Sequence, residues 1–279
     1  MTRDEAQKAM EATLGSLTSD NRWEAYLSVM AKFHRYSVNN SLLIFCQRPD
    51  ATLVQGYHGW RTLGRQVRRG ERGITILAPL IKRESVEERE NPEPHVVGFR
   101  AVSVFDVAQT DGEPLRGMPE LLQTAHHGQL LQAIHQAIPF PVSLVQSLNG
   151  ANGVFNTRAR TIAVIESLAP DMRTKTLLHE WAHGLRDPAD QRSRNEEEVI
   201  AEATAYVVAS HYGLDTRRYS VGYVASWSEG DGKSVLKVTE EILRRSQAIV
   251  APLDEYLQER QRAPERESPP QEPEIALER

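Results

Sequence analysis

Hydrophobic residues recur along this chain with two different spacings, which predict a mixture of helices and strands. Residues 3–47 follow a helical spacing that breaks near Gly15 and around residues 36–40, so two or more helices are expected there. Residues 73–79 and 96–105 alternate and are rich in β-branched side chains, which predicts two strands joined by a charged, exposed loop.

The second half of the chain mixes helices and strands in a different order. One helix is expected over residues 120–137, and strands are expected at residues 142–146 and within residues 153–164. Two further helices are expected to begin near residues 171 and 195.

The predicted fold class is α+β with two domains. Several glycines and prolines between residues 108 and 119 mark the best boundary between the two halves. We therefore predict one domain over residues 1–115 and a second over residues 116–260. Residues 261–279 are rich in Pro and Glu, and we expect them to form a disordered tail.

One stretch of the second half has the spacing of a metal-binding motif. His179 and His183 are four residues apart, so on a helix both imidazoles share one face and can reach one metal ion. Glu180 lies at the side of that face, where its carboxylate can hold a metal-bound water. Leu178 and Trp181 belong to an apolar stripe that supports a helix here. The motif predicts half of a zinc hydrolase site, with Zn²⁺ as the cofactor.

Catalytic zinc keeps three protein ligands and an open position for water, so a third ligand is required. The next helix offers Glu198 and Glu202, which are four residues apart and share one face. We prefer Glu198 on the metal, with Glu202 behind it and hydrogen-bonded to a ligand histidine. The reverse assignment stays open, and Glu198 could instead form a capping box with Asn195. Glu196 and Glu197 are expected to form a solvated first turn.

A zinc peptidase needs more than the metal ligands. Glu180 is the expected general base, and a hydrogen-bond donor must stabilise the oxyanion. His211, Tyr219 and Tyr223 are the candidates for that donor. Related peptidases bind extended substrate along an edge strand, which we expect here to be residues 159–164. The peptide or protein substrate is unknown from the sequence.

Composition and charge narrow the setting of the protein. The 279 residues contain a single cysteine, Cys46, which excludes an internal disulfide and fits a reducing compartment. No signal peptide or membrane-spanning run is recognisable, so we expect a cytoplasmic protein without a membrane partner. Residues 1–80 contain 11 Lys and Arg against 7 Asp and Glu, a charge of +4 within a chain of net charge −5. This asymmetry suggests different partners for the two halves.

Residues 61–73 contain five arginines and one glutamate, and this basic stretch of the first half is a second candidate site. Arginine forks suit phosphates and aromatic faces suit unstacked bases, as a groove for single-stranded nucleic acid requires. Composition alone equally allows an arginine-rich solvated turn with Trp60 in the core. No motif for reading duplex DNA is recognisable. The residues predicted to contact single-stranded DNA are Arg35, Tyr57, Trp60, Arg61, Arg65, Arg68, Arg69 and Arg72.

Several runs of residues, in order from about residue 15 to residue 245, resemble the ArdC-type antirestriction proteins. The metal-binding motif lies in one of them, and Ile200 stands where an extra Glu is common in the family, which leaves Glu198 and Glu202 as candidate ligands. The matching runs are residues 33–44, 47–51, 60–67, 70–74, 104–112, 177–183, 201–208 and 213–215.

The resemblance implies an N-terminal single-stranded DNA-binding domain joined to a zincin-like metallopeptidase domain. This family is carried by conjugative plasmids and other mobile elements, and is associated with protecting incoming DNA from host restriction. Two alternatives stay open: a DNA-protection protein with a structural or vestigial zinc site, and a regulatory peptidase that cleaves a repressor. The basic first half argues against the latter.

Overall fold

The computed structural model describes residues 2–17, 20–82, 95–115, 127–214 and 232–262. The predicted mixture of helices and strands is confirmed in both halves of the chain. The segment between the two predicted strands of the first half, at residues 83–94, and the tail from residue 263 lie outside the described residues. The domain boundaries stay a prediction.

Three helices open the chain, and local capping explains where two of them begin. Thr2 caps the first through a reciprocal pair of hydrogen bonds with Glu5, and the Ser37 side chain caps the third. The predicted breaks near Gly15 and around residues 36–40 are therefore real helix ends. These helices are α1 (Arg3–Ser16), α2 (Asp20–Lys32) and α3 (Val38–Gln47).

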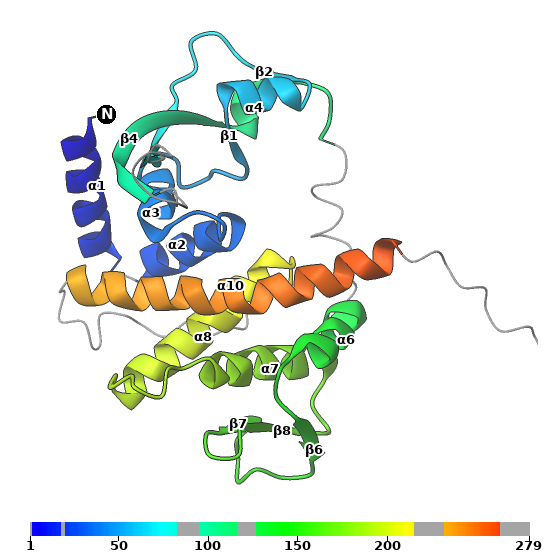
Figure 1. Cartoon of the computed structure of the whole chain (residues 1–279). Coiled ribbons are helices and arrows are strands. Elements are labelled where there is room, and N and C mark those ends of the chain that lie inside the picture. The colour runs from blue at the N-terminus through cyan, green and yellow to red at the C-terminus, as the bar shows by residue number, and fades with distance from the viewer. Residues whose placement is uncertain (1, 18–19, 83–94, 116–126, 215–231, 263–279) are drawn as a thin grey trace, which may run out of the picture.

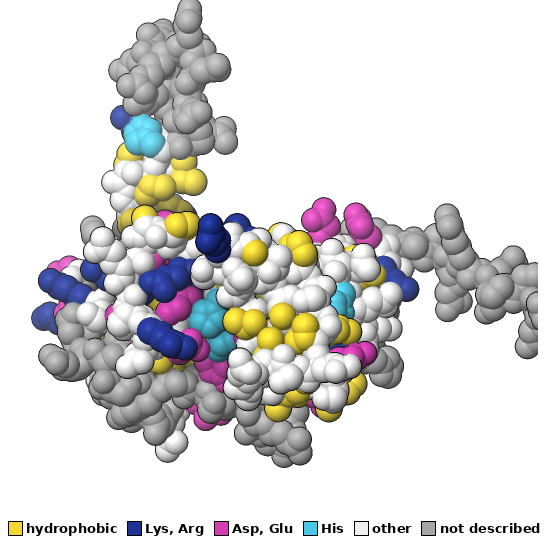
Figure 2. Space-filling view, turned by 90° about the horizontal axis from the view of Figure 1, so that it is seen from below, with side chains coloured by type: hydrophobic (Ala, Val, Ile, Leu, Met, Phe, Trp, Pro, Cys, Tyr) yellow, Lys and Arg dark blue, Asp and Glu magenta, His cyan; other side chains and the backbone are white. Residues whose placement is uncertain are grey.

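Short strands and one long hairpin follow the three helices. A three-stranded antiparallel sheet has the order β1-β4-β3, and a second pair joins β2 to β5. The hairpin of β3 and β4 carries exposed apolar side chains at its outer end, including Ile81 and Phe99, and an arm with hydrophobic side chains projects from the body in Figure 2. The elements are β1 (Val54–Gly56), α4 (Tyr57–Thr62), β2 (Arg65–Val67), β3 (Ile74–Lys82), β4 (His95–Asp106), the 3₁₀ turn η1 (Val107–Gln109) and β5 (Thr110–Gly112).

Where the structure describes the second half, a small sheet is combined with four helices. The sheet has the order β6-β8-β7, with β6 parallel and β7 antiparallel to β8. The expectation that residues 159–164 form an edge strand is wrong, because β6 pairs with β8 on the side away from β7. The elements are α6 (His127–Ala137), β6 (Val142–Val145), β7 (Gly153–Asn156), β8 (Thr161–Ile165), α7 (Pro170–Gly184), α8 (Arg194–His211) and α10 (Gly232–Arg262).

Two hydrophobic cores share helices α8 and α10. On α8, Ile200 and Tyr206 pack with the N-terminal helices, while Ala205 and Val208 pack with α6, α7 and β8. A helix that is apolar on two sides must be buried between neighbours. Helix α10 runs across the molecule between the N-terminal helices and the layer of α7 and α8 (Figure 1). The two cores are therefore joined by elements far along the chain.

Helix α10 was not among the elements predicted from the sequence. Its apolar residues recur at helical spacing and reach both cores, and this spacing is the sequence signal for the helix. No helix within the described residues is both long and apolar enough to cross a membrane.

Candidate metal centre

Helix α7 brings the two histidines of the motif together. Its apolar side chains Leu178 and Trp181 are buried in the second core, which fixes the rotation of the helix. His179 and His183 therefore point to the same side, and their Nε2 atoms lie 3.0 Å apart. The sequence spacing thus predicts this part of the site correctly in geometric terms.

Helix α8 supplies a carboxylate at the same place. The Glu198 Oε2 atom lies 3.5 Å from His179 Nε2 and 3.6 Å from His183 Nε2. Ligand atoms of a tetrahedral zinc site with bonds of 2.0–2.1 Å are separated by about 3.3 Å. The three side chains can therefore hold one metal ion with little rearrangement.

Glu202 lies behind His179. Its Oε2 atom is 3.1 Å from His179 Nδ1, and its other oxygen is 2.6 Å from Lys175 Nζ. A carboxylate that accepts the Nδ1 proton of an imidazole fixes the tautomer that leaves Nε2 available to a metal. Glu198 thus lies on the Nε2 side of both imidazoles, whereas Glu202 lies on the Nδ1 side of His179, and the choice of ligand stays a prediction.

Glu197 supports His183 in the same way, which corrects the expectation of a solvated side chain. It is only 4% exposed, and its Oε1 atom lies 3.1 Å from His183 Nδ1. Fully buried Arg245 of α10 donates to both Glu197 oxygens, at 2.6 and 2.9 Å. Glu196 instead belongs to the first turn and forms a capping box with Ser193. The alternative capping box of Glu198 with Asn195 is therefore not the one at the start of α8. The sequence carries no local signal for the Glu197–Arg245 pair.

Hydrogen bonds to carboxylates alter the protonation of the two histidines. Burial disfavours a charged imidazole, but hydrogen bonds to Glu198 and Glu202 outweigh it and raise the pKa of His179 to about 9. The pKa of His183 is raised against the same cost of burial, by Glu197 and Glu198. Hydrogen bonds from both histidines lower the pKa of Glu198. Because only the neutral imidazole binds a metal ion, a bound cation would have to displace the protons that these carboxylates help the two rings to hold.

Glu180 lies between the histidines and strand β7. Its side chain is 6% exposed, and burial raises the pKa of its carboxyl. The strand passes so close that a Cβ atom on Gly153 would lie 3.1 Å from Glu180 Oε1 and 2.5 Å from Thr176. Glycine is therefore needed where β7 crosses the helix. A buried carboxyl with a raised pKa next to a metal-binding cluster can act as a general base.

These residues open into a cleft of about 920 Å³. Helices α7 and α8 line one side, and residues 151–155 at the start of β7 line the other. Figure 2 shows histidine side chains gathered with basic and acidic ones on the face seen from below. The strand that borders the cleft is the edge strand β7.

The expected oxyanion donor His211 is not in this cleft. It ends helix α8, 13 residues after Glu198, which is about 20 Å along a helix axis. It contacts the carbonyl oxygen of Ala31 in the first half of the chain instead. Tyr219 and Tyr223 lie outside the described residues.

Trp60 and two arginines of the basic stretch have partners within the protein. Trp60 is fully buried and donates to the Phe105 carbonyl oxygen, so it cannot stack on a base and that expectation is corrected. Arg65 donates to Thr110 and to the carbonyl oxygens of residues 110, 112 and 113. Arg68 pairs with Glu71 and Asp111. Arg65 and Arg68 therefore link β2 to β5 and the residues next to it.

The remaining predicted DNA-binding residues are exposed. Arg61, Arg69 and Arg72 have exposed side chains, and Tyr57 is 42% exposed. Arg35 lies beside α10, 3.8 Å from Asp254, and is therefore not part of the basic stretch in space. The exposed subset is the part that can meet a nucleic acid.

Known proteins resemble this chain in two respects, the sequence of its N-terminal domain and its overall fold. The family model for the N-terminal domain of anti-restriction factor ArdC matches residues 6–105. The uncharacterized protein pXO2-81 of Bacillus anthracis is 24% identical over 318 residues, covering 95% of this chain and 54% of that protein. The chain thus spans about half the length of this curated relative.

Two crystal structures of the antirestriction protein ArdC from plasmid R388 share the fold at 19% sequence identity. The metal-free structure gives a TM-score of 0.52 and covers 79% of this chain and 86% of that chain. The Mn(II)-bound structure gives 0.57 and covers 89% and 97%, respectively. The chain therefore carries an N-terminal domain of the ArdC kind at residues 6–105 and shares the fold of the R388 protein.

Proposed function

We propose that this protein binds single-stranded DNA through its first half and hydrolyses a peptide bond at the His179, His183 and Glu198 cluster. The observation that carries the proposal is the placement of buried Glu180 beside three converging metal-ligand atoms, in a cleft bordered by an edge strand. A protein with both activities would protect incoming DNA and would cleave a second protein that encounters this DNA.

Zinc is the proposed metal. The R388 protein has been crystallised with Mn(II), which supports the binding of a divalent ion by this fold. Sites of imidazole and carboxylate bind Zn²⁺ more tightly than Mn²⁺, and the separations of 3.0–3.6 Å suit tetrahedral zinc. When bound, such an ion lowers the pKa of a water molecule and polarises a carbonyl group.

Glu180 is the proposed general base. Its carboxylate would accept a proton from the attacking water and pass it to the nitrogen of the leaving amine. Burial raises its pKa toward the range in which a carboxyl both accepts and returns a proton. Glu202 and Glu197 would hold the imidazoles of His179 and His183 in place during the reaction.

The proposed substrate is an extended segment of a protein. Among the described residues strand β7 pairs with β8 alone, and residues of β7 line the cleft beside Glu180. Backbone hydrogen bonds along that edge would align an added strand and place one of its carbonyl groups near the metal-binding cluster. Side-chain selectivity would then come from the cleft walls.

Replacing Glu180 by Gln should lower peptide hydrolysis at least about a hundredfold while zinc content and single-stranded DNA binding stay unchanged. The carboxamide keeps the size of the side chain but cannot take the proton. The measurement is mass-spectrometric comparison of new protein N-termini in cells that carry the native chain or Glu180→Gln. Glu196→Gln is the matched control, because this carboxylate only caps α8.

Two outcomes would count against this proposal. Equal cleavage by the native chain and by Glu180→Gln would exclude Glu180 as the base. No cleavage by either, with DNA binding intact, would favour a protein that protects DNA and has a structural metal site.

For DNA binding, the exposed cations and the exposed aromatic should separate in their salt dependence. Arg61→Ala/Arg69→Ala should reduce the slope of log affinity against log salt by roughly 0.7 for each lost phosphate contact. Tyr57→Ala should cost about 1–3 kcal/mol per stacked base without altering that slope. Titration of a labelled oligonucleotide at several salt concentrations measures both.

The control is Arg158→Ala, which removes an exposed arginine from the turn between β7 and β8 in the second half. It should leave affinity and slope unchanged. If Arg61→Ala/Arg69→Ala does the same, the basic stretch does not contact DNA.

A further inference from the structure

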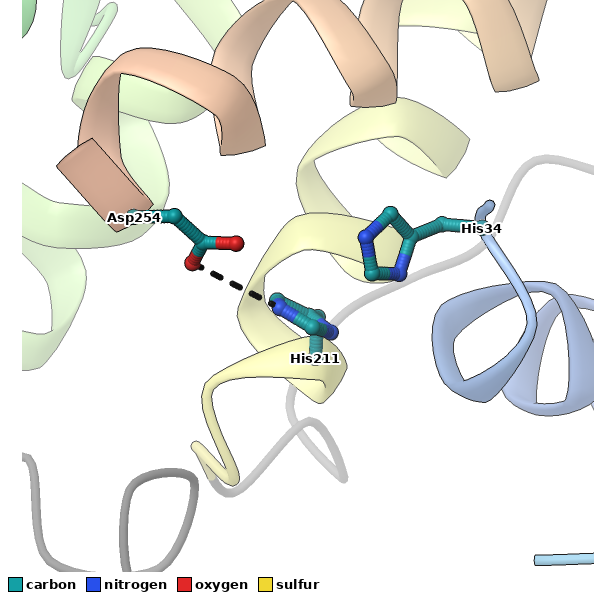
Figure 3. Close-up of side chains that lie close together, drawn as sticks. All are labelled: His34, His211 and Asp254. Carbon is teal, nitrogen blue, oxygen red and sulfur yellow. Dashed lines mark ion pairs between the residues drawn. The ribbon is translucent and has the colours of Figure 1, made fainter. Parts of the chain in front are cut away.

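A second group of metal-ligand atoms lies away from the cleft, where the first half of the chain meets α8 and α10. It consists of His34 in the turn after α2, His211 at the end of α8 and Asp254 on α10. One ligand atom of each lies within 4.8 Å of the others. Figure 3 shows the three side chains converging from these separate elements. Such convergence from distant parts of the chain is unlike a chance surface cluster.

Both imidazoles are held in the orientation that a metal ligand needs. His34 Nδ1 lies 3.4 Å and His211 Nδ1 lies 3.2 Å from the carbonyl oxygen of Ala31. A histidine that donates its Nδ1 proton to a backbone carbonyl keeps the lone pair of Nε2 for a metal. The rings pack edge to face with centroids 4.3 Å apart, and both side chains are less than a tenth exposed.

Asp254 completes the group with an oriented carboxylate. The Tyr212 hydroxyl donates to its Oδ1 atom at 2.9 Å, and the Arg35 guanidinium lies 3.8 Å from its Oδ2 atom. His211 Nε2 lies 3.9 Å from Oδ1, which is beyond hydrogen-bond range. The carboxylate thus keeps lone pairs toward the imidazoles, and it borders a hollow of about 520 Å³ together with His34.

We propose that His34, His211 and Asp254 form a second binding site for a divalent transition-metal ion, separate from the catalytic cluster. Two imidazoles and one carboxylate suit Zn²⁺, Co²⁺ or Ni²⁺ rather than Mg²⁺ or Ca²⁺, which prefer oxygen ligands. The ligand atoms lie within 4.8 Å of one another, and metal binding would bring them to separations of about 3.3 Å. The hollow leaves room for water at the remaining coordination positions.

The site would act as a clamp between the two cores. His34 belongs to the turn between α2 and α3, whereas His211 and Asp254 belong to the helices that connect both cores. An ion that binds only when all three are in place stabilises the packed arrangement over any opened one. The proposal does not rest on the catalytic cluster.

The test uses the full chain with His179→Ala/His183→Ala, which removes the catalytic cluster. After treatment with a chelator, this variant should bind about one equivalent of Co²⁺ or Zn²⁺ by calorimetry. A hundredfold excess of Zn²⁺ over Kd should raise its Tm by about 5 °C. In NMR spectra with labelled histidine, Co²⁺ should displace the imidazole signals of His34 and His211, with no substitution in the site itself.

Adding His211→Gln and Asp254→Asn to the same chain should abolish the binding and the Tm shift, whereas adding His58→Gln should not, because His58 lies exposed on α4. The proposal is overturned if the His179→Ala/His183→Ala chain binds no metal. It is also overturned if binding leaves the signals of His34 and His211 unmoved. The NMR result decides the matter even if the added substitutions prevent folding.

Discussion

Replacing Arg245 by Met is expected to lower the free energy of unfolding by about 3–5 kcal/mol, a large share of a typical total of 5–15 kcal/mol. The guanidinium is fully buried, donates to both oxygens of Glu197, and lies 2.7 Å from a Glu241 oxygen. It also donates to the Ala182 carbonyl oxygen near the end of α7. Without it, the buried Glu197 carboxylate would lose two hydrogen bonds from a guanidinium and keep His183 and the more distant Arg186, 3.8 Å away.

Urea unfolding in the presence of a chelator measures this loss of unfolding free energy. Arg244→Met is the matched control. Arg244 is the neighbouring residue and also pairs with Glu241, but its side chain is 51% exposed. Exposed pairs contribute about 0–1 kcal/mol, so this control should remain close to the native chain. Adding Glu197→Gln to Arg245→Met should restore part of the stability, because it removes a buried charge that has lost its guanidinium partner. Equal losses for the two single variants would contradict the prediction.

The part of the metal centre that the sequence predicted is the part determined by local spacing. His179 and His183 share a helical face because they are four residues apart, and no distant contact can change that relation while the helix persists. The choice between Glu198 and Glu202 depended on how α8 lies against α7. Both glutamates have the required spacing, so only the packing of the two helices decides which one faces the metal position.

The supporting interactions could not be predicted because they join distant residues. Glu197 and Arg245 are 48 positions apart, and Glu197 looked like any acidic residue in the first turn of a helix. The same limit explains why residues 159–164 were wrongly expected to form an edge strand. Strand β8 is internal in the order β6-β8-β7 because β6, which is not its neighbour in sequence, pairs with it in parallel. This limit also explains Trp60, whose burial depends on β4 and could not be read from its basic neighbours.

The fold itself followed the sequence where hydrophobic spacing was strong. Helices in residues 3–47 and the strands of the long hairpin are present as predicted. Sharing of α8 and α10 between the two cores was not foreseen, because apolar residues on two sides of a helix do not reveal which neighbours cover them. That sharing brings Arg245 to Glu197, beside the cluster of His179, His183 and Glu198, and brings Asp254 to His34 and His211.

Glu198→Ala should weaken zinc binding by about a thousandfold, whereas Glu202→Ala should weaken it by about 10–100-fold. Glu198 reaches the metal-facing nitrogens of both histidines, so its loss removes a ligand. Glu202 contacts only the far nitrogen of His179, so its loss frees the ring without removing a ligand. Competition with a chromophoric chelator gives the affinities in a chain that also carries His211→Gln, which excludes the second site. Glu196→Ala should match the parent chain, and a greater loss for Glu202→Ala than for Glu198→Ala would reverse the ligand assignment.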